Sequence, residues 1–212
     1  MTRTRDILRR FRRDEDGTTL VELAIVIPLF LLIFFALVDF GRMGAEYVMA
    51  DKAMQLASRI AVVRPPACAS VPTFNPRAVV APNTVPPAFG TKCASGGAIC
   101  ASPAPVSCVG SPGDPTAAEI WTAISPLMPQ GSSVGDLWFE YAFDPNLNFL
   151  GGPYVPVVTV EIRNLNFQFV TPLGGLAALA TGGAGTGPGT TLPFPAMSMS
   201  LPGEDLDLGE NG

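Results

Sequence analysis

The stretch Gly17-Thr18-Thr19-Leu20-Val21-Glu22, followed directly by the apolar run LAIVIPLFLLIFFALV from Leu23 to Val38, decides how this chain is organised. The run carries no charge, and together with Thr18 to Val21 it reaches about 20 residues, enough to cross a hydrocarbon core of roughly 30 Å. Pro28 inside the run removes one backbone hydrogen bond, a defect that membrane helices tolerate better than soluble ones. The sequence therefore predicts a transmembrane helix over residues 18–38.

Glu22 is the one charged residue at the start of this segment. A carboxylate at the edge of a spanning helix is costly unless it reaches the headgroups or finds a partner. An interfacial Glu is one explanation. The other is that the chain is cut after Gly17, which makes Glu22 the fifth residue of the mature protein and places a new α-amine one helical turn away. Because an amine and a carboxylate attract strongly in low dielectric, the Glu of one subunit could neutralise the amine of its neighbour.

These features resemble a known family. A short basic leader, Gly17, Glu22 and an apolar helix resemble the type IV prepilin processing signal. The stretch from Val21 to Val63 resembles the TadE-like family, minor pseudopilin-like proteins of the tight-adherence (Flp pilus) system, through Glu22, Pro28, the Phe40-Gly41-Arg42 step and an Ala-rich helix. The resemblance implies cleavage between Gly17 and Thr18 by a prepilin peptidase, a role for Glu22 in assembly, and other pseudopilin or Tad subunits as partners.

Charge predicts the topology. The leader, residues 1–17, contains six Arg and four acidic residues, and basic residues are sparse just beyond the apolar run. This bias places the N-terminus in the cytoplasm and the rest of the chain outside the bacterial inner membrane, in the periplasm or beyond. A cleaved secretory signal peptide is disfavoured, because the run is too long and no Ala-x-Ala-like site follows. Nucleic acid is disfavoured as a partner by the net charge of −5.

Residues 39–64 are predicted to continue the helix as an amphipathic stalk. Pro65-Pro66 would end it, giving one helix of about 47 residues and roughly 70 Å. The apolar stripe packs on the protein's own head or stays open to partner subunits, and the pattern is the same for both. The stripe consists of Phe40, Met43, Tyr47, Ala50, Met54, Ala57 and Ala61.

Residues 65–115 form a Pro- and Cys-rich region that is predicted to be irregular and that has no counterpart in the family. Half of the 22 prolines lie here, with all four cysteines. An even number of cysteines in an exported loop predicts disulfides, and three pairings are possible. Zinc is disfavoured because the neighbour spacings are 25, 7 and 8 and no His is present. The cysteines are Cys68, Cys93, Cys100 and Cys108.

Residues 116–203 are predicted to form an exported α+β head, and residues 204–212 an acidic, frayed tail. Asp114 and Pro115 predict the start of a short helix that runs to about Leu127. Alternation predicts strands over 136–143 and 157–165, with 166–170 extending the second or following a bulge. Residues 174–189 are predicted to be a mobile loop, with a short helix near Leu173–Leu179 as an alternative, and 197–201 a last strand. The predicted fold is a long N-terminal helix followed by a short helix and an antiparallel sheet, as in pilins.

No catalytic residue, metal, cofactor or small-molecule substrate is predicted. The absence of His excludes Ser-His-Asp and Cys-His sites, and the Gly-rich stretch 182–185 lacks the Lys of a P-loop. Two functions remain. One is a pseudopilin-like subunit of a Tad/Flp-type pilus assembly or secretion apparatus, processed after Gly17. The other is an uncleaved single-pass envelope protein whose disulfide-stapled head binds a partner.

Overall fold

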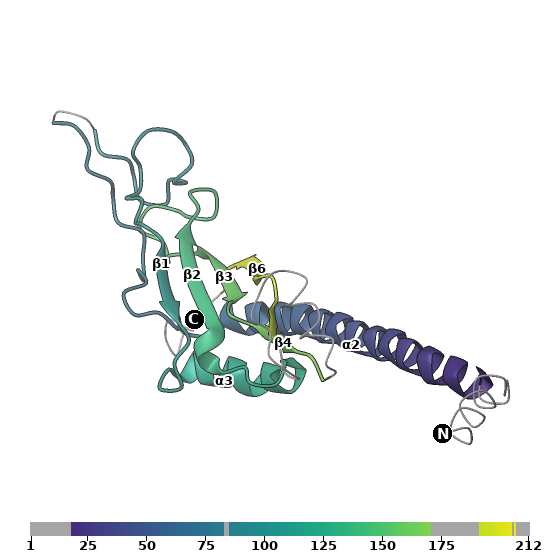
Figure 1. Ribbon diagram of the computed structural model, residues 1–212. Helices are drawn as coiled ribbons and strands as arrows, with labels where there is room; N and C mark the ends of the chain where they lie inside the picture. Colours follow the sequence, from purple (N-terminus) through teal and green to yellow (C-terminus); the bar gives the residue numbers. More distant parts are fainter. Residues whose placement is uncertain (1–17, 83–84, 171–190, 205, 207–212) are drawn as a thin grey trace, which may run out of the picture. The chain divides into compact units, whose positions relative to one another are not determined.

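The computed structural model describes residues 18–82, 85–170, 191–204 and 206, and these form an α+β protein with a long helix, a short helix and an antiparallel sheet (Figure 1). The predicted fold class is confirmed. The chain divides into two compact units. The first unit comprises residues 1–43 and 168–192, and the second unit comprises residues 44–167 and 193–212.

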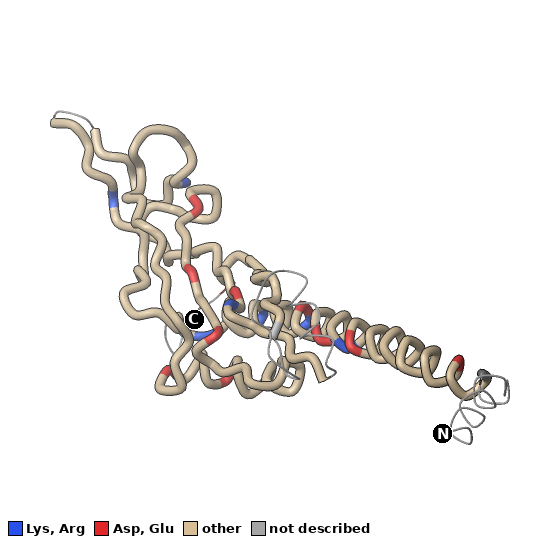
Figure 2. Tube along the Cα trace, viewed as in Figure 1, with Lys and Arg blue, Asp and Glu red and all other residues tan. Residues whose placement is uncertain are grey.

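Helix α2 spans Thr18–Ala61, 44 residues, with Pro28 inside it. Figure 2 shows one acidic position near the start of α2 and then a long stretch without charge. The helix ends slightly before the predicted residue 64. The amide of Val62 donates to the carbonyl of Ser58 and that of Val63 to Ile60, at 3.1 and 3.2 Å, which is the tightened last turn common at helix ends. Since Pro65 disfavours helical backbone at the residue before it, the chain leaves the helix ahead of the proline.

The main sheet has the strand order β1-β2-β3-β6, and all its neighbouring pairs are antiparallel. Phe139 at the centre of β2 lies opposite Cys108 of β1 and Val160 of β3. A second sheet pairs β4 with β5. The strands are β1 (Val106–Val109), β2 (Leu137–Phe143), β3 (Pro156–Ile162), β4 (Asn166–Gln168), β5 (Thr191–Pro193) and β6 (Met197–Pro202).

The core of the second unit lies between this sheet and the helices. Burial alternates along β2 and β3, so one face of the sheet is apolar and covered. Buried side chains of α2 and of α3 (Pro115–Ile124) share one core cluster with the buried side chains of this sheet. Part of the predicted stripe is therefore covered by the protein's own head, whereas Phe40 and Tyr47 of the stripe are exposed. The core includes Ala50, Ala53, Met54, Ala57, Ala61, Ala117, Ile120, Ile124, Leu137, Phe139, Tyr141, Val158, Val160 and Ile162.

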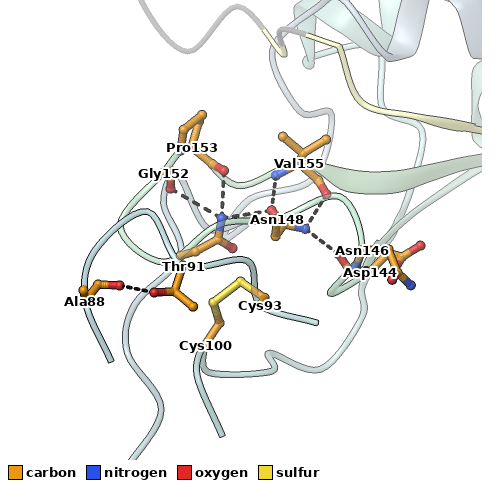
Figure 3. The surroundings of a disulfide bond; sticks show 11 residues. Ala88, Thr91, Cys93, Cys100, Asp144, Asn146, Asn148, Gly152, Pro153 and Val155 are labelled. Atoms are coloured by element: carbon orange, nitrogen blue, oxygen red, sulfur yellow. Dashed lines mark hydrogen bonds between the residues drawn. A yellow bond between two sulfur atoms is a disulfide. The ribbon is translucent and has the colours of Figure 1, made fainter. Parts of the chain in front are cut away.

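Two buried asparagines tie the loops of the second unit together (Figure 3). The Asn148 side-chain oxygen accepts hydrogen bonds from the side chain of Asn75, at 2.9 Å, and from the backbone amide of Val155, at 2.8 Å. The Asn148 side-chain nitrogen donates to the carbonyls of Asp144 and Val155, both at 2.8 Å. The Asn75 side chain also donates to the carbonyl of Pro153, at 2.8 Å. Each amide is thus paired inside the protein, as buried polar groups require.

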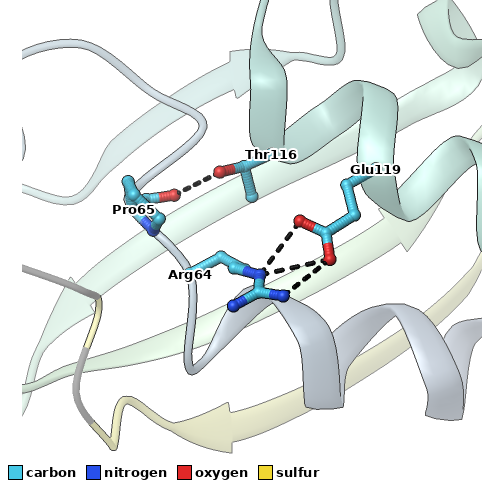
Figure 4. A network of polar contacts seen from close by, with 4 residues as sticks. All are labelled: Arg64, Pro65, Thr116 and Glu119. Atoms are coloured by element: carbon cyan, nitrogen blue, oxygen red, sulfur yellow. Dashed lines mark hydrogen bonds and ion pairs between the residues drawn. The ribbon is translucent and has the colours of Figure 1, made fainter.

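Helix α3 spans Pro115–Ile124, and its predicted start is confirmed, because the Asp114 side chain accepts from the amide of Ala117. Two short 3₁₀ turns, Ser125–Leu127 and Val134–Asp136, lead to β2. The chain leaving α2 is fixed to α3 through Arg64, which donates to both carboxylate oxygens of Glu119 (Figure 4). These hydrogen bonds lower the pKa of the Glu119 carboxyl. Both side chains are exposed, so the pair positions the segment more than it stabilises it.

Two sequence predictions need correction. Strand β1 lies in the region predicted to be irregular, because four residues between Pro105 and Gly110 are too few for alternation to be recognised. The strand predicted over 157–165 ends at Ile162, and residues 166–168 pair in the second sheet instead of extending it. The cause is Asn164, whose φ of 61° is incompatible with a continuing strand. The loop predicted over 174–189 and the helix near 173–179 lie outside the described residues, as does most of the tail.

Tyr141 makes the free energy of unfolding depend on pH. Its hydroxyl accepts a hydrogen bond from the Ala67 amide at 2.9 Å, and burial raises the pKa of Tyr141 from 10.0 to about 12. The neutral phenol therefore contributes stability that is complete below pH 10 and is lost as pH rises toward 12. Between pH 9 and pH 11 we expect wild-type protein to lose about 1.4 kcal/mol more unfolding free energy than Tyr141→Phe. Urea unfolding at both pH values measures this, and equal losses in the two proteins would contradict it.

Candidate processing and membrane-assembly site

The first part of α2 is exposed on every side. The large apolar side chains from Leu20 to Val38 are 40–69% exposed. An all-round apolar helix that packs against nothing in a protein interior is typical of a membrane span. Within the described residues, one helix is long and apolar enough to cross a membrane, and an 18-residue window within it has a mean hydropathy of 2.9. Residues 18–38 would extend about 31 Å, close to the thickness of a hydrocarbon core.

The predicted processing residues lie at the start of this segment. Thr18 is the first residue of α2, and Glu22 is exposed one turn further on. Four residues along a helix correspond to about 6 Å. The Glu22 carboxylate and a positive charge at the backbone nitrogen of Thr18 would therefore be close enough to attract each other in a medium of low dielectric constant. Gly17 lies outside the described residues. The structure therefore brings together Thr18 and Glu22 of the predicted site.

Sequence reasoning missed a second charged pair at the other end of the apolar run. Asp39 is only 1% exposed, and its carboxylate lies 3.5 Å from the guanidinium of Arg42, one turn later. A buried carboxylate requires a partner, and the spacing of three residues on a helix provides one. This spacing was visible in the sequence, but the burial of Asp39 was not. Charges thus bracket the apolar segment, with Glu22 near its start and the Asp39–Arg42 pair at its end.

The four cysteines are paired as Cys68–Cys108 and Cys93–Cys100, one of the three pairings that the sequence left open. The first disulfide joins the segment after α2 to β1, and the second closes a short loop. In the described part of the chain, no cluster of His, Cys, Asp or Glu could hold a metal ion. Two hollows of about 380 and 570 Å³ among the loops have no charged side chain in their lining.

The fold and the site define a class of protein: an α+β head carried by one N-terminal apolar helix, whose length and exposure indicate membrane anchoring. Residues 17–59 match the model of a family described as TadE-like protein. The family predicted from Glu22, Pro28 and the following helix is confirmed over this segment. Neither the curated proteins nor the solved structures contain a match to the chain.

Over the residues that it covers, the match supports a membrane protein related to the Tad pilus. It includes Gly17, Thr18 and Glu22, the exposed apolar helix and the Asp39–Arg42 pair. It stops at Arg59, just before α2 ends. The head after α2 therefore lies outside the match.

Proposed function

We propose that this chain is a pseudopilin-like subunit of a Tad/Flp-type pilus assembly or secretion apparatus and that a prepilin peptidase cleaves it between Gly17 and Thr18. Residues 18–38 hold it in the inner membrane, with the leader in the cytoplasm and the second unit on the outer side. The observation that carries the proposal is the exposed Glu22, one turn from Thr18, at the start of an exposed apolar helix inside the segment that matches the TadE-like family.

Cleavage would give Glu22 its function. The new α-amine of Thr18 carries a positive charge, and the cost of both charges in the membrane falls when they pair. Pairing between neighbouring subunits sets their relative height in the membrane, because the charges attract strongly only at short distance in low dielectric. Glu22 therefore acts as an assembly residue in this proposal.

The part of α2 beyond the membrane segment offers a further surface for other pseudopilin or Tad subunits. Ala50, Met54 and Ala57 are buried against the sheet, whereas Val48, Leu56 and Val63 are exposed. Val48 and Leu56 are spaced by eight and therefore lie on the same side of α2, whereas Val63 lies just beyond the end of the helix. This face supports contacts with neighbouring subunits that continue those of the membrane segment.

A second candidate function is an uncleaved single-pass envelope protein with a binding head. It is favoured by the two disulfides, which fix the loops of the second unit. Both functions need the same anchor and topology. They differ in whether Gly17 and Glu22 are needed.

The N-terminus of the membrane-extracted full chain distinguishes the two. With a co-expressed prepilin peptidase, mass spectrometry is expected to find a mature protein starting at Thr18, and Gly17→Ala is expected to remain uncut. The matched control is Gly41→Ala, because an added Cβ at Gly41 meets no atom within 4 Å, and this variant should be cut normally. An intact N-terminus in the wild-type protein under these conditions would contradict cleavage and would favour the second candidate function, the uncleaved single-pass envelope protein.

Glu22→Gln extends the same experiment. It keeps the side-chain shape and removes the charge, so we expect normal cleavage but a several-fold loss of cross-links from α2 to other pilus subunits in membranes. Cross-linking equal to wild type would show that the carboxylate does not direct assembly, even if cleavage is confirmed.

A further inference from the structure

One loop of the second unit has an unusual composition. Residues 78–91, AVVAPNTVPPAFGT, contain no charged side chain, and Arg77 and Lys92 lie directly before and after them. No Asp or Glu occurs anywhere from Pro65 to Gly113, although the chain as a whole has a net charge of −5 (Figure 2). The described residues of this segment, 77–82 and 85–92, are called the apolar loop below, and they are a weakly basic part of an acidic protein.

The apolar side chains of this loop are exposed to solvent. Val79 is 97% exposed, Val85 89% and Phe89 74%. Figure 1 shows the described parts of the loop extending away from β1 and β2. Such side chains are usually buried, and single exposed ones need no explanation, but several on one uncharged loop indicate an interaction site.

The base of the apolar loop is fixed on both sides. On one side the Ala78 amide donates to the carbonyl of Ile99 at 3.1 Å, next to the Cys93–Cys100 disulfide. On the other side the Gly90 amide donates to the carbonyl of Leu150 at 2.9 Å. The loop is therefore presented by a folded base.

Phe89 is also held in place. Its ring lies against Gly151, where an added Cβ would come within 2.4 Å of the ring. The Arg77 guanidinium lies 5.1 Å from the ring centre and donates to the carbonyl of Pro87 at 3.0 Å. The aromatic ring and the cation are thus oriented together, with the ring still largely exposed.

We infer that the apolar loop docks on a lipid bilayer surface that carries anionic headgroups. Exposed Val and Phe side chains on a projecting loop can enter the boundary between headgroups and acyl chains without a matching flat surface, while Arg77 and Lys92 remain among the phosphates. The absence of acidic residues in this part of the chain removes repulsion from an anionic membrane. A protein partner would instead require a continuous complementary patch of several hundred Å². The inference does not depend on cleavage at Gly17.

Recruitment of vesicles tests this. The oxidised full chain is embedded through α2 in phosphatidylcholine nanodiscs and mixed with heavy vesicles of phosphatidylcholine, with or without phosphatidylglycerol. Wild-type nanodiscs are expected to sediment with vesicles that contain phosphatidylglycerol, more weakly with neutral ones, and less as salt rises. Val79→Asp combined with Val85→Asp is expected to reduce the bound fraction at least about ten-fold, because two apolar side chains no longer enter the bilayer.

The matched control is Val109→Asp combined with Val170→Asp. Both positions lie outside the loop and are 50% and 69% exposed, so the control makes the same change in net charge. It is expected to keep most of the binding. Absence of wild-type recruitment, which would leave the loop as a protein-binding surface, overturns the inference. Equal binding to neutral and anionic vesicles, or equal losses in the two double variants, also overturns it.

Discussion

Replacement of Cys68 and Cys108 by Ala is expected to lower the free energy of unfolding of the second unit by about 4 kcal/mol. The two cysteines are 40 residues apart in sequence, and their disulfide connects the segment after α2 to β1. A cross-link that closes a loop of this length removes much of the freedom of the unfolded chain. The Cys93–Cys100 disulfide spans only 7 residues, so the same argument gives about 2.3 kcal/mol for its removal.

The two double-Ala variants are each other's control. Both lose one disulfide and two sulfur atoms, and they differ chiefly in the length of the loop. Urea unfolding of the detergent-solubilised chain, followed by the fluorescence of Trp121 and Trp138, reports on α3 and β2 of the second unit. A larger loss for the Cys93–Cys100 pair than for the Cys68–Cys108 pair would contradict the prediction.

Much of the fold could be predicted because its determinants are local. The uncharged run predicted the first part of α2, and Asp114-Pro115 predicted the start of α3, because a cap acts within one turn. Strands β2 and β3 were predicted from alternation, which one buried face imposes on consecutive residues. In the candidate site, Glu22 was identified for the same reason. A carboxylate beside an apolar run is unusual, and this can be recognised from the sequence without knowledge of the fold.

The remaining features depend on residues that are distant in sequence. Nothing near Cys68 selects Cys108 over the other two cysteines, because the choice follows from the position of β1 beside β2. The end of β3 depends on the left-handed backbone of Asn164, a conformation that Asn permits but does not require. The burial of Asp39 likewise could not be inferred from the sequence Phe40-Gly41-Arg42 that follows it.

The hydrogen-bond network of Asn148 also could not be predicted from the sequence. Its removal is the other change for which we expect a large loss of stability. Asn148→Ala is expected to lower the free energy of unfolding of the second unit by about 3–5 kcal/mol. Asn148 is fully buried, and its amide pairs with Asn75, Val155 and Asp144. Truncation would remove the hydrogen bonds that the Asn148 side chain makes to the amide and the carbonyl of Val155, and one hydrogen bond each from Asn75 and Asp144, which keep their bonds to Pro153 and Leu147. Each polar group that loses its partner has a cost.

The matched control for this variant is Asn146→Ala, two residues away on the same loop. The Asn146 side chain is exposed and makes a 3.0 Å hydrogen bond only to the Asp144 carboxylate among the described contacts. Water can replace that bond, so the loss should be below about 1 kcal/mol. Urea unfolding gives both values, and hydrogen exchange of the Val155 amide should become faster in Asn148→Ala alone. Similar stability losses in the two variants would show that burial of the Asn148 amide contributes little.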